Sequence, residues 1–321
     1  MEGISLVIPS NGKSVVMEII LSSIARQKFH LPTEVILVLN GLEIEPERER
    51  LTSQWVAPLG LMLRIELLAK PGVNRSRNRG LQNSKYETVF FLDDDCELDD
   101  SYLLEKHFLI HNQNPQLLAV GGVYSLSKKA SFFSRLYQEV QMQWLHRGLK
   151  YEHPQREASY LIGGHFSVKK KMLIENGISF DEEITYGGSE LSFFAKTQEK
   201  NFKLELHDFS VLHHTQETFF SLHRKFFRQG QGKARLKNSF ETGLSDASIK
   251  SEKQQGPVRK ITFIYFGWIF WFGYYYQKKN KLGFLFYLLR VAVNFVIFVR
   301  GKSLERISKL IEIKKKRGDR F

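Results

Sequence analysis

The sequence of 321 residues has a single cysteine, Cys96, which excludes an intrachain disulfide and suits a reducing compartment. Its first ten residues contain neither a basic region nor a long apolar run. We therefore expect them to form the first strand of a domain and not a signal peptide. No internal repeat is found. Hydrophobic residues make up 42% of the chain, which is enough for a sizeable core and argues against a disordered protein.

Acidic residues are scarce only in the last part of the chain. Residues 1–249 carry 30 Lys/Arg and 30 Asp/Glu, whereas residues 250–321 carry 17 and 4 and therefore hold the whole net charge of +13. The same segment is also the most aromatic part of the chain. A neutral domain followed by a basic, aromatic segment is typical of a protein that binds an anionic membrane surface, and it argues against nucleic acid as a partner.

No apolar run in this segment reaches the roughly 20 residues that a membrane-spanning helix requires. The 16 residues Ile261–Tyr276 carry no charge, and the 18 residues Leu282–Val299 are interrupted by Arg290 and Asn294. A spanning hairpin would also place the lysine-rich loop between them outside, against the positive-inside tendency. We expect two helices that lie in the interface at the cytoplasmic face of a membrane. A spanning or re-entrant pair is one alternative, and a buried subdomain or the contact face of a homo-oligomer is another.

Strand and helix patterns alternate along the first hundred residues. This alternation predicts an α/β fold with a mainly parallel sheet and a binding crevice at the carboxyl ends of its strands. A polar segment later in the chain reads as a linker, which divides the chain into an α/β domain of residues 1–238, a linker of residues 239–255 and a helical region of residues 256–321. The expected strands are Ser5–Pro9, Glu34–Leu39, Leu63–Leu67 and Thr88–Leu92, and the expected helices are Val15–Gln27 and Arg75–Gln82.

Three carboxylates, Asp93–Asp95, directly follow the apolar residues Phe90–Leu92. Mutual repulsion makes such a cluster costly unless a cation or bound water relieves it. Clustered oxygen ligands suit Mg²⁺ or Mn²⁺, which keep open positions for phosphate oxygens. An acidic turn at a strand end is the competing interpretation of the triplet on its own.

A second charged motif precedes the acidic triplet. Within Pro71–Leu81, three arginines occupy alternate positions where a Gly/Asn-rich loop enters a helix: Arg75, Arg77 and Arg79. Free N–H groups at a helix start, together with arginines, suit an anion, although a solvated basic helix face is the simpler alternative. The two motifs together in one α/β unit predict a site for a metal ion and a diphosphate.

The sequence resembles the family 2 glycosyltransferases of the GT-A fold from about Ile4 to Leu236. The resemblance implies a Rossmann-like, mainly parallel sheet and an inverting, metal-dependent transferase that uses Mg²⁺ or Mn²⁺. Such an enzyme moves a sugar from a nucleotide-diphosphate donor to a hydroxyl of a glycan or lipid-linked acceptor. The matching motifs are Ser5–Ser10, Val35–Gly41, Asn78–Leu81, Phe91–Asp95, Gly163–Phe166, Phe180–Glu183, Gly188–Leu191 and Phe227–Leu236.

The resemblance also implies roles for single residues. Glu190 would be the general base that deprotonates the acceptor. Asp93 and Asp95 would bind the metal, and either His213 or His214 would be a later metal or diphosphate contact. Gly164 and His165 would lie near the acceptor. The implied donor contacts are Pro9, Asn40, Arg75, Arg77, Asn78, Asp93, Asp94, Arg228 and Arg235.

The resemblance leaves the donor and the exact function open. Leu39 stands where the family often has an acidic residue that reads uracil, so the nucleotide base is not fixed. Ser189 and Glu190 replace the usual Glu-Asp pair. Two other functions fit the same crevice: a nucleotidyltransferase, and a non-catalytic scaffold that binds a sugar nucleotide.

Overall fold

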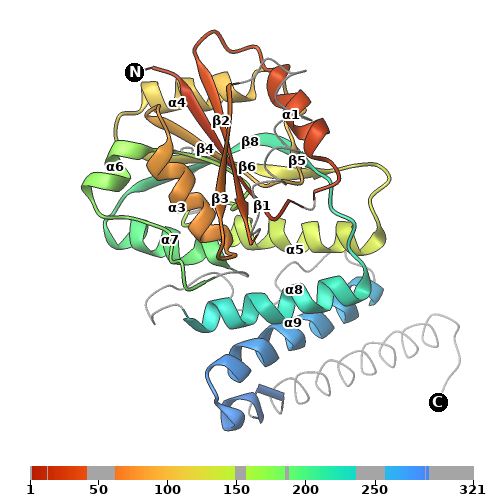
Figure 1. Ribbon diagram of the computed structural model, residues 1–321. Helices are drawn as coiled ribbons and strands as arrows, with labels where there is room; N and C mark the ends of the chain where they lie inside the picture. The colour runs from red at the N-terminus through yellow and green to blue at the C-terminus, as the bar shows by residue number, and fades with distance from the viewer. Residues whose placement is uncertain are drawn as a thin grey trace, which may run out of the picture.

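The computed structural model describes residues 2–12, 14–41, 62–148, 157–184, 188–235, 257–285 and 287–288. Figure 1 shows a twisted sheet with helices packed on it and further helices stacked below. The four strands and two helices predicted in the first hundred residues are all present, with ends within two residues of the prediction, whereas the short strand Cys96–Glu97 was not predicted.

Eight strands of the described residues form one sheet, in the order β3-β2-β1-β4-β7-β6-β8-β5. Strands β3, β2, β1 and β4 are parallel to one another, whereas β7 runs antiparallel between β4 and β6. The mainly parallel sheet predicted from the sequence is confirmed. The strands are β1 (Ile4–Ser10), β2 (Thr33–Asn40), β3 (Met62–Leu68), β4 (Thr88–Leu92), β5 (Cys96–Glu97), β6 (Leu117–Leu126), β7 (His165–Lys169) and β8 (Lys203–His213).

Helices cover both faces of the sheet. Helix α3 (Val73–Asn83) lies against the face that carries Val7, where a Cβ on Gly80 would be only 2.2 Å from a Val7 methyl carbon. Helix α4 (Leu103–Gln113) lies on the opposite face and contacts Ser167 of β7 through two histidines. The other helices around the sheet are α1 (Met17–Ala25), α6 (Lys170–Glu175) and α7 (Ser189–Glu199).

Phenylalanines fill the core on the α3 face. Phe180 stacks on Phe193 of α7 with 4.2 Å between ring centroids, and both rings contact Phe166 of the sheet. Fully burying one such side chain stabilises the fold by about 1.5–3 kcal/mol relative to leaving it exposed. This packing fixes α7, whose first turn carries Glu190, against the sheet.

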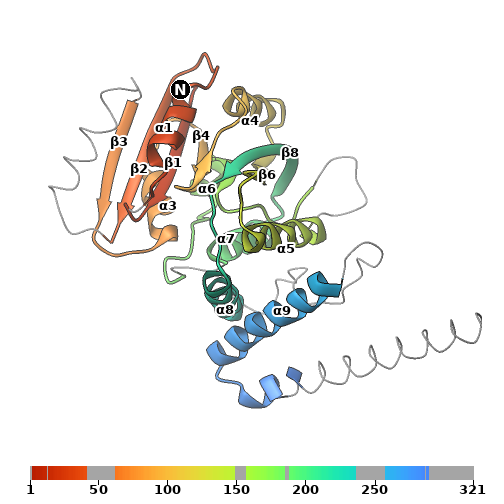
Figure 2. The same cartoon turned by 90° about the vertical axis from the view of Figure 1, so that its right-hand side faces the viewer.

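Helices α5 (Phe132–Gly148), α8 (Phe219–Arg235) and α9 (Pro257–Gln277) stack below the sheet, as Figures 1 and 2 show from two sides. Buried residues from all three helices form a second hydrophobic cluster. The backbones of α8 and α9 cross closely at two glycines. A Cβ on Gly230 would lie 1.8 Å from the Phe270 carbonyl oxygen, and one on Gly273 would lie 2.1 Å from that of Phe227.

The last segment was predicted to be a membrane-associated region after a linker, and this stays a prediction. In the structure, α9 packs onto α8 and shares the second hydrophobic cluster with α5. The predicted linker, residues 239–255, lies outside the described residues, and so does most of the predicted helix Leu282–Val299. Among the described helices, none combines the length and the apolar character that crossing a membrane requires.

Candidate functional site

The site forms at the carboxyl ends of three neighbouring parallel strands. Ser10 ends β1, Asn40 ends β2, and Asp93 directly follows β4. The Asn40 side chain joins two of these ends to the loop before α3: its Nδ2 donates to the Ser10 carbonyl at 2.8 Å, and the Gly72 N–H donates to its Oδ1 at 3.1 Å. Asn40 therefore shapes the crevice in which it was predicted to contact the nucleotide.

Protein groups engage both carboxylate oxygens of Asp93. Arg77 Nη2 donates to Oδ1 and the Tyr124 hydroxyl donates to Oδ2, each at 3.2 Å. Burial and then the neighbouring Asp93 raise the pKa of Tyr124 well above its usual value, so the hydroxyl keeps its proton. The same hydroxyl accepts a hydrogen bond from the Gly164 N–H at 3.1 Å. Asp93 is thus held in one orientation by an arginine and a tyrosine.

Asp94, in the middle of the acidic cluster, has a raised pKa. Burial, followed by the repulsion of Asp95 and Asp93, raises the pKa of Asp94 to about 7, although the Ser10 hydroxyl donates to it at 2.5 Å. Burial is the largest cause of this shift, and the two neighbouring carboxylates add a repulsion that a divalent cation would offset. These residues therefore fit a divalent cation.

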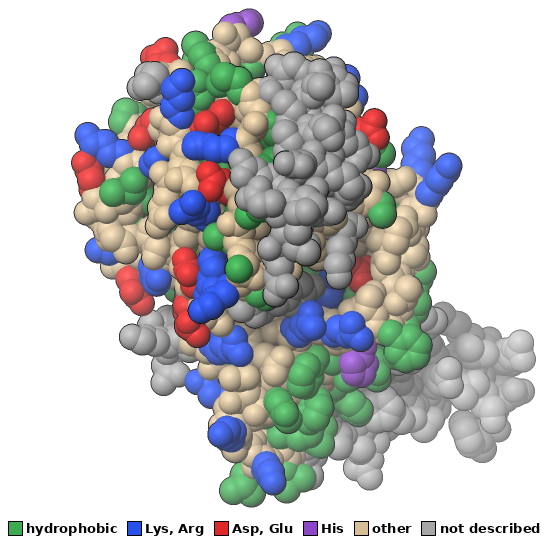
Figure 3. All heavy atoms as spheres, viewed as in Figure 1, with side chains coloured by type: hydrophobic (Ala, Val, Ile, Leu, Met, Phe, Trp, Pro, Cys, Tyr) green, Lys and Arg blue, Asp and Glu red, His purple; other side chains and the backbone are tan. Residues whose placement is uncertain are grey.

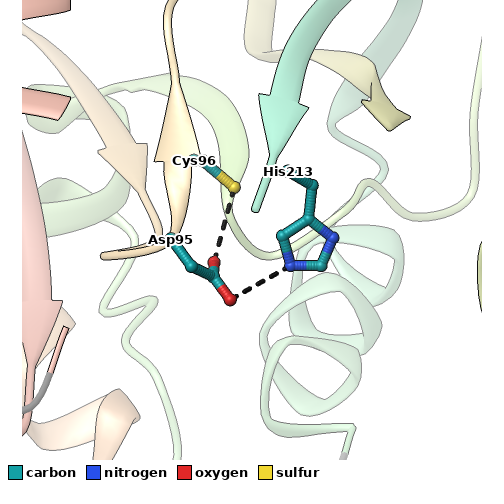
Figure 4. A group of neighbouring side chains, drawn as sticks. All are labelled: Asp95, Cys96 and His213. Atoms are coloured by element: carbon teal, nitrogen blue, oxygen red, sulfur yellow. Dashed lines mark hydrogen bonds and ion pairs between the residues drawn. The ribbon is translucent and has the colours of Figure 1, made fainter. Parts of the chain in front are cut away.

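Asp95, Cys96 and His213 point toward one another (Figure 4). The pairing of β5 with β8 sets Cys96 opposite His213, and one ligand atom from each of the three residues lies within 4.8 Å of the others. His213 Nε2 is 3.1 Å from Asp95 Oδ2, and the Cys96 thiol is 3.7 Å from Asp95 Oδ1. Among the described residues, this group has the ligand types and the spacing to hold a metal ion.

The ionisation of this group favours an oxygen and a nitrogen ligand. Burial alone would raise the pKa of Asp95, but the hydrogen bond and charge of His213 hold it below its ordinary value. Burial, with the nearby carboxylates, raises the pKa of the Cys96 thiol well above its usual range. Asp95 therefore offers an ionised oxygen ligand for Mg²⁺ or Mn²⁺, with the His213 ring nitrogen beside it.

The structure separates the two histidines between which the sequence could not decide. His214 Nε2 lies 2.8 Å from Glu97 Oε2, while its backbone N–H donates to the Asp95 carbonyl at 2.8 Å. His213 alone places its ring beside the Asp95 carboxylate. The ring of Tyr124 also packs on His213, with 4.5 Å between centroids.

Arg77 links the acidic cluster to the first turn of α7. Its guanidinium is almost fully buried and donates to Asp93, to the Gly163 carbonyl at 2.9 Å and to Ser189 Oγ at 3.3 Å. The Ser189 hydroxyl in turn donates to Glu190 Oε2 at 3.1 Å. Arg77 was predicted as a nucleotide contact, but this position makes it a residue that fixes the orientation of Asp93 and Ser189.

Two glycines lie between the acidic cluster and Glu190. A Cβ on Gly164 would be 2.2 Å from Asp93 Oδ2, and one on Gly163 would be 2.9 Å from Arg77 Nη2 and 3.4 Å from Glu190 Oε2. Any side chain at Gly164 would collide with Asp93. The paired glycines therefore let Asp93 and Glu190 approach opposite sides of one short backbone segment.

Asn78 and Arg75 hold the segment that precedes α7. The Asn78 amide exchanges hydrogen bonds with the backbone of Phe180 and donates to Glu182 Oε1 at 3.0 Å. Arg75 Nε donates to the other oxygen of Glu182 at 3.2 Å. The predicted nucleotide contact of Asn78 does not fit this placement, because its buried amide is already used within the protein.

His165 also departs from its predicted role. Its side chain is fully buried under α4, beside Phe90 and His107, and Nδ1 lies 3.1 Å from the Val123 carbonyl. Burial lowers its pKa to about 4. A side-chain contact with an acceptor does not fit this position, whereas Gly164 does lie at the site.

The remaining predicted donor contacts lie at two different places. Pro9 is buried within β1, next to Ser10. Arg228 and Arg235 are exposed on α8, and Arg235 Nη1 donates to the Glu183 carbonyl at 3.1 Å. This bond ties the end of α8 to the segment that precedes Glu190.

Sequence reasoning missed three residues that complete the site. Ser10 and Ser189 are direct neighbours of the predicted residues Pro9 and Glu190, so their positions in the motifs could have indicated them. Tyr124 comes from β6, and no motif marks it. Only the fold places its hydroxyl between Asp93 and Gly164.

Comparison with known proteins gives the family and the fold. The sequence profile of Glycosyl transferase family 2 matches residues 5–177, which is more than half of the chain. N-acetylgalactosaminyltransferase 7 of Drosophila melanogaster is 26% identical over 207 residues, which is 59% of this chain and 35% of that relative. The chain therefore spans little more than a third of the length of this curated relative.

Two solved structures have a similar fold. A mannosyltransferase from Pyrobaculum calidifontis in complex with GDP-Man and Mn²⁺ has a TM-score of 0.56 at 12% identity, over 94% of this chain and 79% of that chain. TarS of S. aureus in complex with UDP-GlcNAc has a TM-score of 0.52 at 14% identity, over 85% of this chain and 73% of that chain. At such low identity these likenesses show the fold, and the predicted GT-A fold is confirmed.

Proposed function

The chain belongs to glycosyl transferase family 2, and on this premise we propose that it transfers a sugar from a nucleotide-diphosphate donor to an acceptor hydroxyl. The transfer inverts the anomeric configuration and uses a divalent cation. The observation that carries the proposal is the hydrogen-bonded series Asp93–Arg77–Ser189–Glu190 around the paired glycines. It links an acidic, cation-fitting cluster to a separate carboxylate across the paired glycines.

The acidic cluster serves the donor. Asp95 and His213 would hold the cation, which when bound neutralises charge that develops on the departing diphosphate. Asp93, oriented by Arg77 and Tyr124, would accept a hydrogen bond from a ribose hydroxyl. The two structural neighbours were solved with GDP-Man and with UDP-GlcNAc, which supports a sugar-nucleotide donor and leaves its base open.

Glu190 serves the acceptor. It lies in the first turn of α7, and the Ser189 hydroxyl orients its carboxylate. The carboxylate takes the proton of the acceptor hydroxyl as the oxygen forms its bond to the sugar carbon. The bond from that carbon to the diphosphate oxygen breaks in the same step, and the nucleoside diphosphate leaves with the electron pair. One direct displacement inverts the configuration and needs no covalent enzyme intermediate.

We also propose that the protein works at the cytoplasmic face of an anionic membrane, on a glycan or lipid-linked acceptor. Helix α9 has two different faces: Phe270 is buried toward α8, whereas Trp268, Phe272 and Tyr276 are 39%, 42% and 63% exposed. Figure 3 shows hydrophobic side chains beside basic ones at the end of the molecule where α8 and α9 lie. Aromatic side chains with nearby lysines suit the interface of an anionic leaflet.

A donor panel tests the proposed reaction. Purified protein is incubated with UDP-, GDP- and CMP-linked sugars, with Mn²⁺, with Mg²⁺ or with a chelator, and the products are separated by chromatography. We expect one donor to release its nucleotide, slowly with water as acceptor, and only in the presence of the cation. For a diphosphate donor the product is the nucleoside diphosphate.

Two results would favour the alternatives. Formation or consumption of pyrophosphate would identify a nucleotidyltransferase. Tight, saturable donor binding without release, with or without extracts that supply acceptors, would identify a non-catalytic scaffold. Release that is equally fast in the presence of the chelator would contradict the proposed role of the cation.

A further inference from the structure

An exposed aromatic cluster lies where helices α5 and α8 begin, at the right-hand edge of the molecule in Figure 1. Phe132 is 55% exposed, Phe219 is 39% exposed and Phe220 is 80% exposed. The ring of Phe133 joins the two helices, with centroid distances of 5.4 Å to Phe132 and 6.0 Å to Phe219. These four residues form one apolar surface, which we call the aromatic patch. Contiguous exposed apolar side chains mark a surface that contacts a partner or a membrane.

Exposed basic side chains border the aromatic patch on both helices. They come from the loop before α5, from the first turn of α5 and from α8: Lys128, Lys129, Arg135 and Arg224. Arg135 Nη2 donates to the Lys128 carbonyl at 2.5 Å, which holds this loop beside α5. Arg224 follows Phe220 by four residues, so the two side chains share one face of α8. Figure 3 shows hydrophobic and basic side chains side by side over α8.

No exposed acidic side chain offsets these charges within the two described segments that carry the patch, residues 127–136 and 216–228. The single acidic residue in these segments is Glu217, which is 5% exposed. Its carboxylate pairs with Lys225 and accepts a hydrogen bond from the Ser221 hydroxyl. The patch therefore combines exposed aromatic rings with uncompensated positive charge, which fits an anionic lipid surface.

Hydrogen bonds tie the patch to the metal-fitting group of the site. Strand β8 ends at His213, shortly before α8 begins. The segment between them is fixed on the start of α5: the Ser134 hydroxyl donates to the Thr215 carbonyl at 3.1 Å, and the Glu217 N–H donates to the Ser134 hydroxyl at 2.8 Å. The Ser131 hydroxyl also donates to the Glu217 carbonyl at 2.7 Å. A surface bound to the patch would therefore have a fixed position relative to the site.

We propose that the aromatic patch docks on an anionic membrane. Phe132 and Phe220 enter the interface of the leaflet, and the basic border binds the lipid phosphates. This inference rests on the proposed membrane location, and it adds a contact on α5 and α8 to the exposed face of α9. The two surfaces adjoin, because Tyr265 of α9 stacks on Phe219 with 5.7 Å between ring centroids. Together they set the orientation of the site relative to the leaflet.

The charge of the patch favours lipid over a second copy of this chain. A two-fold contact through the patch would place the basic border of one copy against the same border of the other. Like charges brought together in an interface oppose binding. An anionic leaflet instead attracts these side chains, and each Lys or Arg near its surface contributes about fivefold in affinity.

The first test places a fluorescent reporter in the patch of the full-length protein. The native Cys96 is fully buried, so a thiol-reactive, environment-sensitive dye should label only a cysteine introduced at the surface. Phe220→Cys provides that cysteine in the patch. Ile174→Cys is the matched control, because Ile174 is 59% exposed on α6, at the opposite edge of Figure 1. The vesicles contain phosphatidylcholine with or without phosphatidylserine.

We expect the dye at residue 220 to become brighter and to emit at shorter wavelength when phosphatidylserine vesicles are added, because it enters the lipid interface. The dye at residue 174 should not respond. Vesicles of phosphatidylcholine alone should have little effect on either protein.

The second test removes charge from the border. Lys128→Gln/Lys129→Gln should weaken co-sedimentation with phosphatidylserine vesicles about 30-fold, the contribution of two charges near an anionic surface. Lys200→Gln/Lys203→Gln is the matched control, because these two lysines are exposed near the other end of β8. It should bind the vesicles as tightly as the wild type.

Two results would overturn the inference. One is a wild-type protein that binds phosphatidylserine vesicles, with no response of the dye at residue 220 and unchanged binding of Lys128→Gln/Lys129→Gln, which would assign the contact to α9 alone. The other is a dye response that needs no vesicles and grows with protein concentration, which would identify the patch as a contact between copies. A wild-type protein that does not bind the vesicles would contradict the proposed membrane location itself, and this inference with it, but not the proposed transfer reaction.

Discussion

The two sides of the site differ in chemistry. On the donor side, Asp93–Asp95 stand beside Arg77, His213 and Ser10, each of which contacts one of the three carboxylates. In a cavity beside Glu190, the wall carries amides and aromatic rings, and two amide oxygens have no described partner. Charge is concentrated on one side of the paired glycines and is nearly absent from the other.

This difference matches what each substrate presents. A nucleoside diphosphate develops negative charge as it leaves, which a cation and a polar site stabilise. An acceptor sugar is neutral and is recognised by hydrogen bonds and apolar contact. Glu190 is the one acidic residue among the described residues that line the cavity. A single carboxylate in a neutral setting suits the general base that we propose.

Removing the base should give the largest effect on the reaction. Glu190→Gln keeps the shape of the side chain but cannot take up the proton, so kcat should fall about 10²–10⁴-fold. Donor affinity should survive, because the acidic cluster is untouched. Rapid-quench measurement of transfer, with calorimetry of donor binding, checks this. Near-normal turnover would assign the base to another residue, such as Asp181 or Glu183.

Removing a buried ring from the helix stack tests whether α9 packs on α8 as the structure shows. Phe270→Ala removes a buried ring from the α8–α9 contact and should lower the free energy of unfolding by about 3–5 kcal/mol. Its matched control is Trp268→Ala, on the other face of the same helix, which should cost less because that side chain is 39% exposed whereas Phe270 is 5% exposed. Urea unfolding of both variants gives the comparison.

The same pair tests the membrane proposal. Trp268→Ala should co-sediment with phosphatidylserine vesicles more weakly than the wild type does. Neither the wild type nor Trp268→Ala should bind phosphatidylcholine vesicles strongly. Phe270→Ala with wild-type stability would mean that α9 is not packed as described. Unchanged vesicle binding by Trp268→Ala would remove this face of α9 from the membrane contact.

Acid should lower the free energy of unfolding through three histidines that are buried between the sheet and α4. Burial lowers the pKa of His111 to about 3 and that of His165 to about 4, and it lowers the pKa of His107 well below its usual value, with nearby His165 adding to the effect. In the unfolded chain these groups protonate near pH 6.5. Their contribution to stability is therefore present above about pH 6.5 and is lost as the pH falls toward the folded-state values.

The expected loss at pH 5 is about 2 kcal/mol for each histidine, because the unfolded state takes up a proton that the folded state does not. Urea unfolding measured from pH 7.5 to pH 5 checks this. His111→Gln should reduce the pH dependence of the unfolding free energy by the contribution of one of the three histidines. His30→Gln, whose side chain is 87% exposed, should leave the slope unchanged, and an equal effect of both variants would contradict the account.

The donor side could be predicted from the sequence because its residues belong to short, continuous motifs. Asp93–Asp95 follow a strand that its apolar pattern defines, and Arg77 lies in a helix start only a few residues upstream. The sheet then brings together strand ends whose order an α/β pattern already implies. The local motifs and the order of the strands therefore indicate the same site.

The cavity beside Glu190 could not be predicted because its residues come from separate helices. Gln141, Gln229 and Phe270 carry no motif, and their approach depends on how α5, α8 and α9 pack. The aromatic character of α9 was read as membrane contact, yet Phe270 and Gly273 serve a close helix crossing. Periodicity marks an apolar face of a helix, but it does not tell whether protein or lipid covers it.

The central claim is a single displacement in which Glu190 activates the acceptor opposite the departing diphosphate. The anomeric configuration of the product tests it most directly. Proton NMR of the transfer reaction, recorded as it proceeds with the active donor and an octyl glycoside as acceptor, reports this configuration through the coupling constant of the anomeric proton. The account predicts that an α-linked donor yields a β-linked product and a β-linked donor an α-linked one. Retention of the donor configuration in the first product formed would contradict it.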